Sequence, residues 1–218
     1  MVQTIQVIGS AVAARLRERG YAVSPDEGEL VLLCVPDRVI ADVASGIEPG
    51  PWIAHTSGAT PLAALHPHTR RFGIHPLQSF TRARGPEQLD GAYAAVTAET
   101  DDAREIGFWL ADELGLAPFA LDESERALYH AGAVVAASYL VTLHEAAAEM
   151  LEAAGAPPEA LVPMMRRVIE NDFELTGPVI RGDWATVEAH LEAIRERLPT
   201  LEPLYRALAD ATAEVAAR

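Results

Sequence analysis

The sequence predicts an α/β domain built on a parallel sheet, followed by an all-helical domain. Short apolar runs alternate with helical patterns from residue 1 to 121, as in a parallel sheet covered by helices. No strand pattern follows Asp122. Alanine is abundant in the second half, where it favours close-packed helices. We therefore expect one domain over residues 1–121 and a second over residues 122–218.

Composition narrows the classes of partner. The chain has 218 residues, half of them hydrophobic, and a formal net charge of -15. Such a charge repels phosphate backbones and anionic membrane surfaces, so we expect neither nucleic acid nor membrane as a partner. The charge does not exclude binding of a small-molecule ligand. The single cysteine, Cys34, excludes an intrachain disulfide. With no signal-peptide pattern at the start, the sequence predicts a cytoplasmic protein.

The first elements have the order of a nucleotide-binding β-α-β unit. A strand is expected over residues 4–8, a helix from Ser10 to Gly20, and a second strand over residues 21–23. A dinucleotide-binding loop usually reads G-x-G-x-x-G, because glycines let the backbone approach a pyrophosphate. Here only Gly9 is present, and Ser10 follows at once, so the loop is shortened. Gly9 and Ser10 are nevertheless the candidates for contact with a cofactor.

The next segment is shortened as well. An apolar run over residues 30–35 predicts a buried strand, and residues 24–29 leave no room for a helix before it. Asp26 in this turn is either a solvated loop residue or a contact for a ribose hydroxyl. Pro36 and Asp37 end the strand, and a helix is expected over residues 38–44. Asp37 either caps that helix or contacts a ligand above the strand end.

The stretch from His55 to Phe80 contains four of the seven histidines. Strands are expected over residues 52–55 and 71–74, and each ends at a histidine followed by polar or turn-forming residues. Loops at the carboxyl ends of parallel strands form the ligand crevice of open α/β sheets. We therefore expect His55 and Ser57 to hold a cofactor or a substrate carboxylate, and His75 to be a candidate for proton transfer.

The same stretch also contains residues of the kind that bind metals. His66 and His68, with His55 or His75, could form a three-histidine site. However, His66 and His68 flank Pro67 in a turn, and no carboxylate lies nearby in the sequence. The prediction is that no metal binds.

The remaining elements follow from periodicity and breaks. A strand is expected over 92–96, a helix over 101–114 and an edge strand over 118–121. Helices should then cover 123–154, 158–175 and 183–198, with a fourth after Pro199. Thr176 and Arg181, around the helix break at Gly177, either offer a hydroxyl and a cation to an anionic substrate or serve only the break and an ion pair with Asp183.

Several motifs together resemble a poorly characterised family of Rossmann-like proteins described as NADP-dependent oxidoreductases, whose C-terminal domain is like that of 6-phosphogluconate dehydrogenase. The similarity covers nearly the whole chain. The matching residues are LVLLCVPD (30–37), HTSG (55–58), GIHPLQSF (73–80), ALYH (127–130) with Ser138, and LTGPVIRGD (175–183) with Thr186, Val187, His190 and Leu191.

The resemblance implies a function for the two domains. It places NADP over the strand ends of the first domain, where Pro36, Asp37, His55 and Ser57 are the candidate contacts. Substrate would lie in the cleft against the helical domain, and a homodimer would form through that domain. Ser138, Thr176 and Arg181 are the candidate substrate contacts; alternatively, Ser138 only permits close helix packing. The proton donor in this superfamily commonly comes from the first helix after the sheet, where His130 is the titratable residue; otherwise His130 is a histidine packed at the interface.

Two hypotheses follow. The first is an NADP-dependent oxidoreductase that acts on a small acidic substrate, with His130 and His75 as catalytic residues. The second is a non-catalytic ligand-binding or scaffold dimer that kept the fold and lost dinucleotide binding. The shortened glycine loop favours the second, whereas the histidines at the strand ends favour a small-ligand site.

Overall fold

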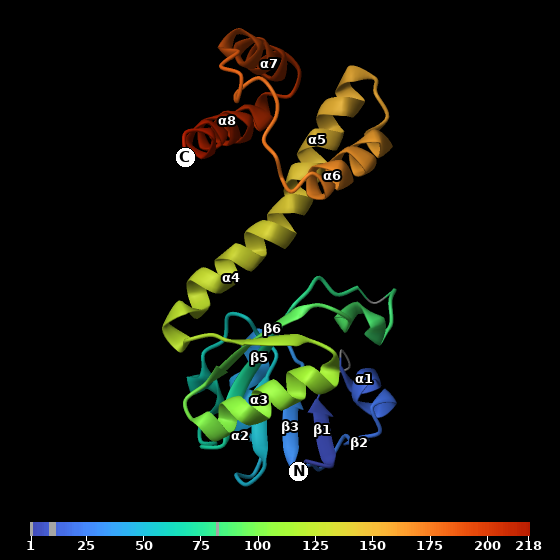
Figure 1. The fold of residues 1–218 in the computed structure, drawn as a ribbon, viewed down its shortest axis with the longest axis vertical. Coiled ribbons are helices and arrows are strands. Elements are labelled where there is room, and N and C mark those ends of the chain that lie inside the picture. Colours follow the sequence, from blue (N-terminus) through green and yellow to red (C-terminus); the bar gives the residue numbers. More distant parts are fainter. Residues whose placement is uncertain (1, 9–11, 82) are drawn as a thin grey trace. The chain divides into compact units, whose positions relative to one another are not determined.

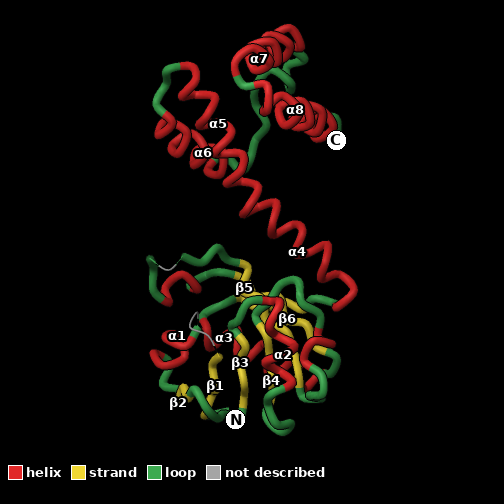
Figure 2. Tube along the Cα trace, turned by 180° about the vertical axis from the view of Figure 1, so that it is seen from behind, coloured by secondary structure: helices red, strands yellow, loops and turns green. Residues whose placement is uncertain are grey.

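A computed structural model describes residues 2–8, 12–81 and 83–218. The chain divides into two compact units, 1–137 and 138–218. The first unit is an α/β sheet domain and the second is helical, so the predicted fold class is confirmed (Figures 1 and 2). The helix that we expected to open the second domain contributes its first turns to the first unit.

One seven-stranded sheet forms the first unit, in the order β2-β1-β3-β4-β5-β6-β7. The strands are β1 (Thr4–Ile8), β2 (Ala22–Ser24), β3 (Leu30–Leu33), β4 (Trp52–His55), β5 (Arg71–Leu77), β6 (Tyr93–Ala98) and β7 (Ala117–Ala120). Strands β1 to β5 run parallel to one another. Because β2 and β3 flank β1 on opposite sides, the strand order changes direction between β1 and β3, which is where open α/β sheets bind ligands.

We expected a parallel sheet, but the structure shows a mixed one. β6 runs antiparallel to β5, and β7 is parallel to β6. A parallel return needs a crossover, usually an α-helix. The described residues of the β5–β6 connection contain only a short 3-10 helix (Pro86–Leu89), and Gln88 donates to three carbonyls within the loop. The connection therefore folds back as a hairpin, and β5 extends through His75 to Leu77 rather than ending at Ile74.

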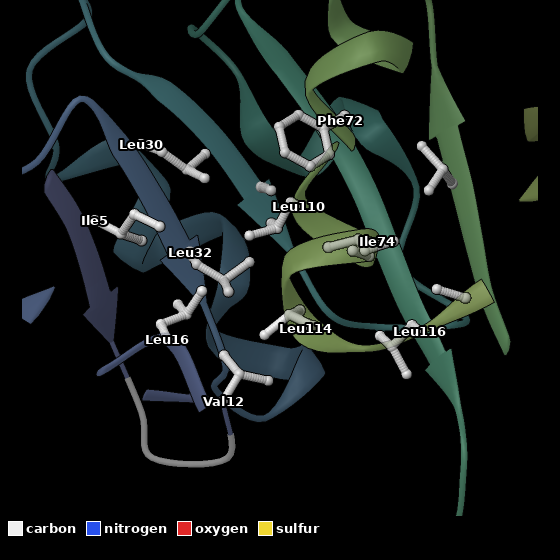
Figure 3. Close-up of a cluster of buried hydrophobic side chains, with 14 of the residues drawn as sticks. Ile5, Val12, Leu16, Leu30, Leu32, Phe72, Ile74, Leu110, Leu114 and Leu116 are labelled. Atoms are coloured by element: carbon white, nitrogen blue, oxygen red, sulfur yellow. The ribbon is translucent and has the colours of Figure 1, made fainter. Parts of the chain in front are cut away.

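Helices cover both faces of the sheet. Helices α1 (Ala13–Glu18) and α3 (Asp101–Leu114) pack on one face, where the larger core cluster lies (Figure 3). Helix α2 (Ile40–Ser45) and a 3-10 helix (Leu62–Leu65) cover the other face, over β3 and β4. Helix α3 is capped at both ends, with the Thr100 side chain accepting from the Ala103 N–H and Gly115 in a left-handed conformation after its last turn.

The link between β2 and β3 is as short as predicted. Ser24 accepts hydrogen bonds from the N–H groups of Asp26 and Glu27 in a tight turn. Gly28 then passes so close to β1 that a Cβ there would lie 2.4 Å from the Gln6 nitrogen. Only glycine fits this approach, and the chain enters β3 with no helix in between. The first unit is thus a reduced Rossmann-like sheet.

Helix α4 (Arg126–Val134) belongs mainly with the first unit and is followed by a π-helical turn (Val135–Tyr139). The second unit contains α5 (Leu140–Ala154), α6 (Leu161–Glu170), α7 (Trp184–Arg197) and α8 (Glu202–Ala216). Helix α6 ends before the expected residue 175, because Asp172 and Phe173 adopt positive φ angles. Asp183 caps α7 by accepting a hydrogen bond from the Thr186 N–H.

Candidate functional site

The carboxyl ends of four parallel strands define one edge of the sheet. Ile8, Leu33, His55 and Gly73 lie at the same level in the strand register. Strand β4 stops at His55, whereas β5 continues to Leu77. His75 therefore projects beyond the end of β4, beside the loop that begins at Thr56.

His75 is the centre of a cluster of aromatic side chains in the first unit. Its Nδ1 atom lies 2.7 Å from the hydroxyl of Tyr129, and the two rings meet edge to face. The ring of His130 is 6.1 Å from that of His75. Gly58 lies between them, since a Cβ there would be 2.7 Å from Cδ2 of His130 and 2.9 Å from Nε2 of His75. The structure thus brings together the two histidines predicted to be catalytic.

Burial sets the protonation of this cluster. Burial, together with the nearby His130 and Arg126, lowers the pKa of His75 to about 4, so the ring is neutral at pH 7. Burial also raises the pKa of Tyr129 to about 12, so its hydroxyl keeps its proton. The site therefore presents a neutral imidazole and a neutral phenol.

An ion pair at the start of α4 fixes this helix to the strand-end loop. The buried Arg126 binds Glu123 through two nitrogens, at 3.1 and 2.9 Å, and donates to the Ser57 carbonyl at 3.3 Å. The other oxygen of Glu123 accepts from the Leu62 N–H at 2.9 Å. Since Tyr129 lies one turn after Arg126, these bonds position the phenol over His75.

Ser57 and Asp37 bind each other. The Ser57 hydroxyl donates to Asp37 at 2.8 Å and accepts from the N–H groups of Ala59 and Thr60. Ser57 thus shapes the loop. Asp37 does not cap the following helix, which corrects the capping interpretation: the N-cap position is Pro36, and the structure shows no side-chain cap there. Asp37 instead joins the end of β3 to the loop after β4.

His55 is fully buried rather than open to a ligand. Neither of its ring nitrogens has a hydrogen-bond partner among the described residues. Burial, with Arg126 nearby, lowers its pKa to about 4, so it is neutral. Gly73 lies next to the side chains of both Arg126 and His55, since a Cβ there would lie 3.1 Å from the Arg126 guanidinium and from the His55 ring.

The other predicted site residues are placed as follows. Gly9 and Ser10 lie outside the described residues. Pro36 is exposed at the end of β3. Ser138, Thr176 and Arg181 are exposed and belong to the second unit, so their contact with substrate stays a prediction. Of the histidines weighed for a metal, His66 is exposed and His68 is buried against the Ala44 carbonyl; within the described ranges, no three metal-ligating side chains form a group.

Sequence reasoning missed the ion pair of Glu123 and Arg126 and the role of Tyr129. The i,i+3 spacing of Glu123 and Arg126 was visible, but charges at a helix start are usually solvated. Tyr129 lies beside His130 in the ALYH motif, and the sequence pattern assigns it no role of its own. The tyrosine could have been singled out because an aromatic residue with a polar tip, next to a candidate histidine, is suited to bond a second ring.

Comparisons with known proteins agree with this architecture. A family described as "Domain of unknown function (DUF2520)" matches residues 92–212, more than half of the chain. No curated protein matches the sequence. A structure named as a proposed NADP oxidoreductase from Bacteroides fragilis is 19% identical, with a TM-score of 0.80 over 97% of this chain and 98% of that one.

Two further structures show the same fold. A protein from Thermotoga maritima is 24% identical, with a TM-score of 0.82 over 98% of both chains. An NADH-preferring ketol-acid reductoisomerase from an uncultured archaeon is 16% identical, with a TM-score of 0.62 over 97% of this chain and 85% of that one. The predicted resemblance to Rossmann-like oxidoreductases is thus confirmed at the level of the fold.

Proposed function

We propose that this chain, which belongs to the DUF2520 family, is an NADP-dependent oxidoreductase that acts on a small acidic substrate. The observation that carries the proposal is the cluster of His75, Tyr129 and His130 around Gly58 at the carboxyl edge of the sheet. Reduction of a carbonyl needs a hydride source and groups that bind and protonate the carbonyl oxygen. The cluster supplies the second requirement from the protein itself.

The edge of the sheet fits the nicotinamide half of a dinucleotide in part. Such a cofactor supplies or accepts a hydride when bound. Pro36 and Asp37 at the end of β3, and the loop of Ser57 after β4, are the described residues that would hold it, while the buried His55 ends β4 directly before this loop. Gly9 and Ser10 remain proposed contacts for the pyrophosphate.

The ribose end fits NADP less well. A 2′-phosphate needs a nearby cation, usually arginine, after the second strand. Here Pro25, Asp26 and Glu27 follow β2, so the described turn presents carboxylates. NADP therefore enters the proposal from the family resemblance, and NAD is the competing cofactor.

Titration of the purified protein with NADPH and with NADH, followed by nicotinamide fluorescence, tests cofactor binding. Micromolar binding of either cofactor supports the proposal, and the ratio of the two dissociation constants decides between NADP and NAD. If neither binds at millimolar concentration, the oxidoreductase proposal is wrong. A screen of small carbonyl acids would follow a positive result.

His130→Ala tests the proposed proton donor once turnover is found. We expect turnover to be abolished, with His190→Ala, on an exposed helix position of the second unit, as the control. Full activity of His130→Ala would remove His130 from the mechanism. Ser138, Thr176 and Arg181 are the proposed substrate contacts, and Arg181→Gln should raise KM for an acidic substrate.

The second candidate is a ligand-binding or scaffold dimer without turnover. The specific observation in its favour is the link from β2 to β3, in which Gly28 lies against β1 and no helix intervenes. The cofactor titration separates the two candidates, because the scaffold protein would bind neither dinucleotide.

We also propose a cytoplasmic homodimer that forms through the helical domain. Large apolar side chains of the second unit are more than half exposed in the single chain, namely Tyr139, Val141, Met164, Ile169, Phe173 and Trp184. An apolar cavity of about 610 Å³ opens between its helices, lined in part by Met150, Leu151 and Met164. A second copy would cover this surface.

Sedimentation equilibrium tests the dimer. We expect a dimer at micromolar concentration and a shift toward monomer in Val141→Glu with Ile169→Glu.

The segment Glu123–Ala154 is also long and apolar enough to cross a membrane by length and composition. A monomer in sedimentation, or partition of the chain into lipid vesicles, would contradict this part of the proposal.

A further inference from the structure

We infer that Tyr129 fixes His75 in the tautomer that carries its hydrogen on Nε2, so that this nitrogen donates a hydrogen bond to an oxygen atom of the substrate. The role toward substrate rests on the proposed function. The tautomer itself does not, because it follows from contacts within the first unit. This assigns His75 as a hydrogen-bond donor, in place of the proton-transfer role expected from the sequence.

The bond between Tyr129 and His75 has two possible directions. A neutral imidazole has one N–H donor and one bare nitrogen acceptor. If Nδ1 carried the hydrogen, it would donate to the phenol oxygen, and the hydroxyl hydrogen of Tyr129 would need another acceptor. The described residues offer the Tyr129 hydroxyl no hydrogen-bond partner other than His75. If Nδ1 is bare, the phenol donates to it at 2.7 Å and both groups are satisfied.

The surroundings hold the phenol in this position. Phe119 of β7 meets the Tyr129 ring edge to face, at 6.0 Å between centroids, and the His75 ring packs against it from β5. The bonds from Arg126 to Glu123 fix the start of α4 one turn earlier. Because burial raises the pKa of Tyr129 to about 12, its hydroxyl keeps its proton and can donate a hydrogen bond at neutral pH.

Because the two ring nitrogens point in different directions, Nε2 faces away from Tyr129. Nε2 lies next to Gly58, where a Cβ would come within 2.9 Å, and has no hydrogen-bond partner among the described residues. The ring of His130 lies on the other side of Gly58. A substrate oxygen atom that reaches Nε2 past Gly58 would receive a hydrogen bond from His75 and lie near His130.

A neutral imidazole in this place stabilises charge without transferring a proton. A fixed N–H aimed at a developing oxyanion lowers the barrier of carbonyl chemistry, and removal of one such donor typically costs a factor of about 100–1000 in kcat. Neutral histidine is known to act in this way where its pKa is lowered. His75 would then orient and polarise the oxygen, leaving proton transfer to His130.

Nitrogen-15 NMR of the histidine side chains tests the tautomer in the free protein. The two ring nitrogens have distinct shifts when protonated and when bare, and His75→Gln assigns the signals of His75. We expect Nδ1 bare and Nε2 protonated in the wild type at pH 7. In Tyr129→Phe we expect the fixed tautomer to be lost, with both nitrogens moving toward the values of a mixed population.

The chain offers a matched control in the second unit. His190 Nδ1 lies 2.6 Å from the hydroxyl of Tyr205, in the same kind of contact but at an exposed position. Tyr205→Phe should leave the His75 signals unchanged. A wild-type ring protonated on Nδ1, or a His75 signal that is the same in Tyr129→Phe, would overturn the inference. The wild-type spectrum alone decides the tautomer if Tyr129→Phe does not fold.

The donor role has its own test. Glutamine can place an amide N–H near the Nε2 position, whereas leucine cannot donate. We expect His75→Gln to retain kcat/KM within about tenfold and His75→Leu to lose about 100-fold or more. Equal losses in the two variants would refute the donor role. A wild-type protein without any turnover would refute the proposed function and this role together, while the NMR result on the tautomer would stand.

Discussion

Arg126 is the residue through which stability and site geometry can be tested together. Its side chain is 6% exposed and makes two bonds to Glu123 and one to the Ser57 carbonyl. Arg126→Met keeps most of the apolar volume and removes all three bonds. The change leaves the Glu123 carboxylate and the Ser57 carbonyl without this donor.

The expected loss of stability follows from burial. Breaking a buried ion pair costs about 3–5 kcal/mol, because the remaining charge stays desolvated. Glu123 is 40% exposed and keeps the Leu62 N–H, so its carboxylate is partly solvated. We therefore expect the low end, about 3 kcal/mol. For a chain of this size that lowers the melting temperature by about 6–12 °C.

Thermal and urea unfolding, followed by circular dichroism, measure the effect. The control is Arg104→Met, which removes an i,i+3 pair with Asp101 at 2.6 Å whose partners are 43% and 89% exposed. That pair should contribute less than about 1 kcal/mol. If Arg126→Met costs no more than Arg104→Met, burial does not strengthen the pair, and the argument for Arg126 as the fixed point of α4 fails.

Two further predictions concern the histidines. Gly58→Ala places a Cβ against His75 and His130, whose ring ends can move, so it should cost about 1 kcal/mol while changing the His75 NMR signals. Gly107→Ala, whose Cβ would lie 2.5 Å from Val96 in the core, should cost about 1–3 kcal/mol and leave those signals unchanged; the reverse pattern would show that Gly58 does not space the rings. His55 titrates at about 4 when folded, below its usual pKa, so the unfolded chain binds more protons between these values. Stability is therefore full above pH 6.5 and falls as the pH drops toward 4, by about 2 kcal/mol at pH 5 from this residue. Urea unfolding across this range should show less slope in His55→Gln than in the wild type or in His190→Gln, and an unchanged slope would contradict the burial argument.

Periodicity and turn signals predicted most of the first unit. Strand β4 and helix α3 have the expected bounds, since an apolar run bounded by turn residues or a capped amphipathic pattern is a local property. The reversed direction of β6 was not predictable in this way, because strand direction depends on how a connection folds in space. The pairing of Ser57 with Asp37, and of Tyr129 with His75, joins residues that are 20 and 54 positions apart. Sequence patterns placed these residues at strand and helix ends but could not show which side chains meet.

The reversed direction of β6 and β7 determines at which level of the sheet the chain leaves β7 and approaches the site. Strand β7 ends at Ala120, which is level with Val96 and, across β6, with Ile74. The chain thus leaves the sheet one residue below His75 rather than above it. The Arg126 guanidinium at the start of α4 lies next to Gly73, and Tyr129 and His130, one turn later in the helix, lie alongside His75. Arg126 and His130 lie on successive turns of the same helix. Any shift of its first turn would therefore change the distance between the imidazoles of His130 and His75.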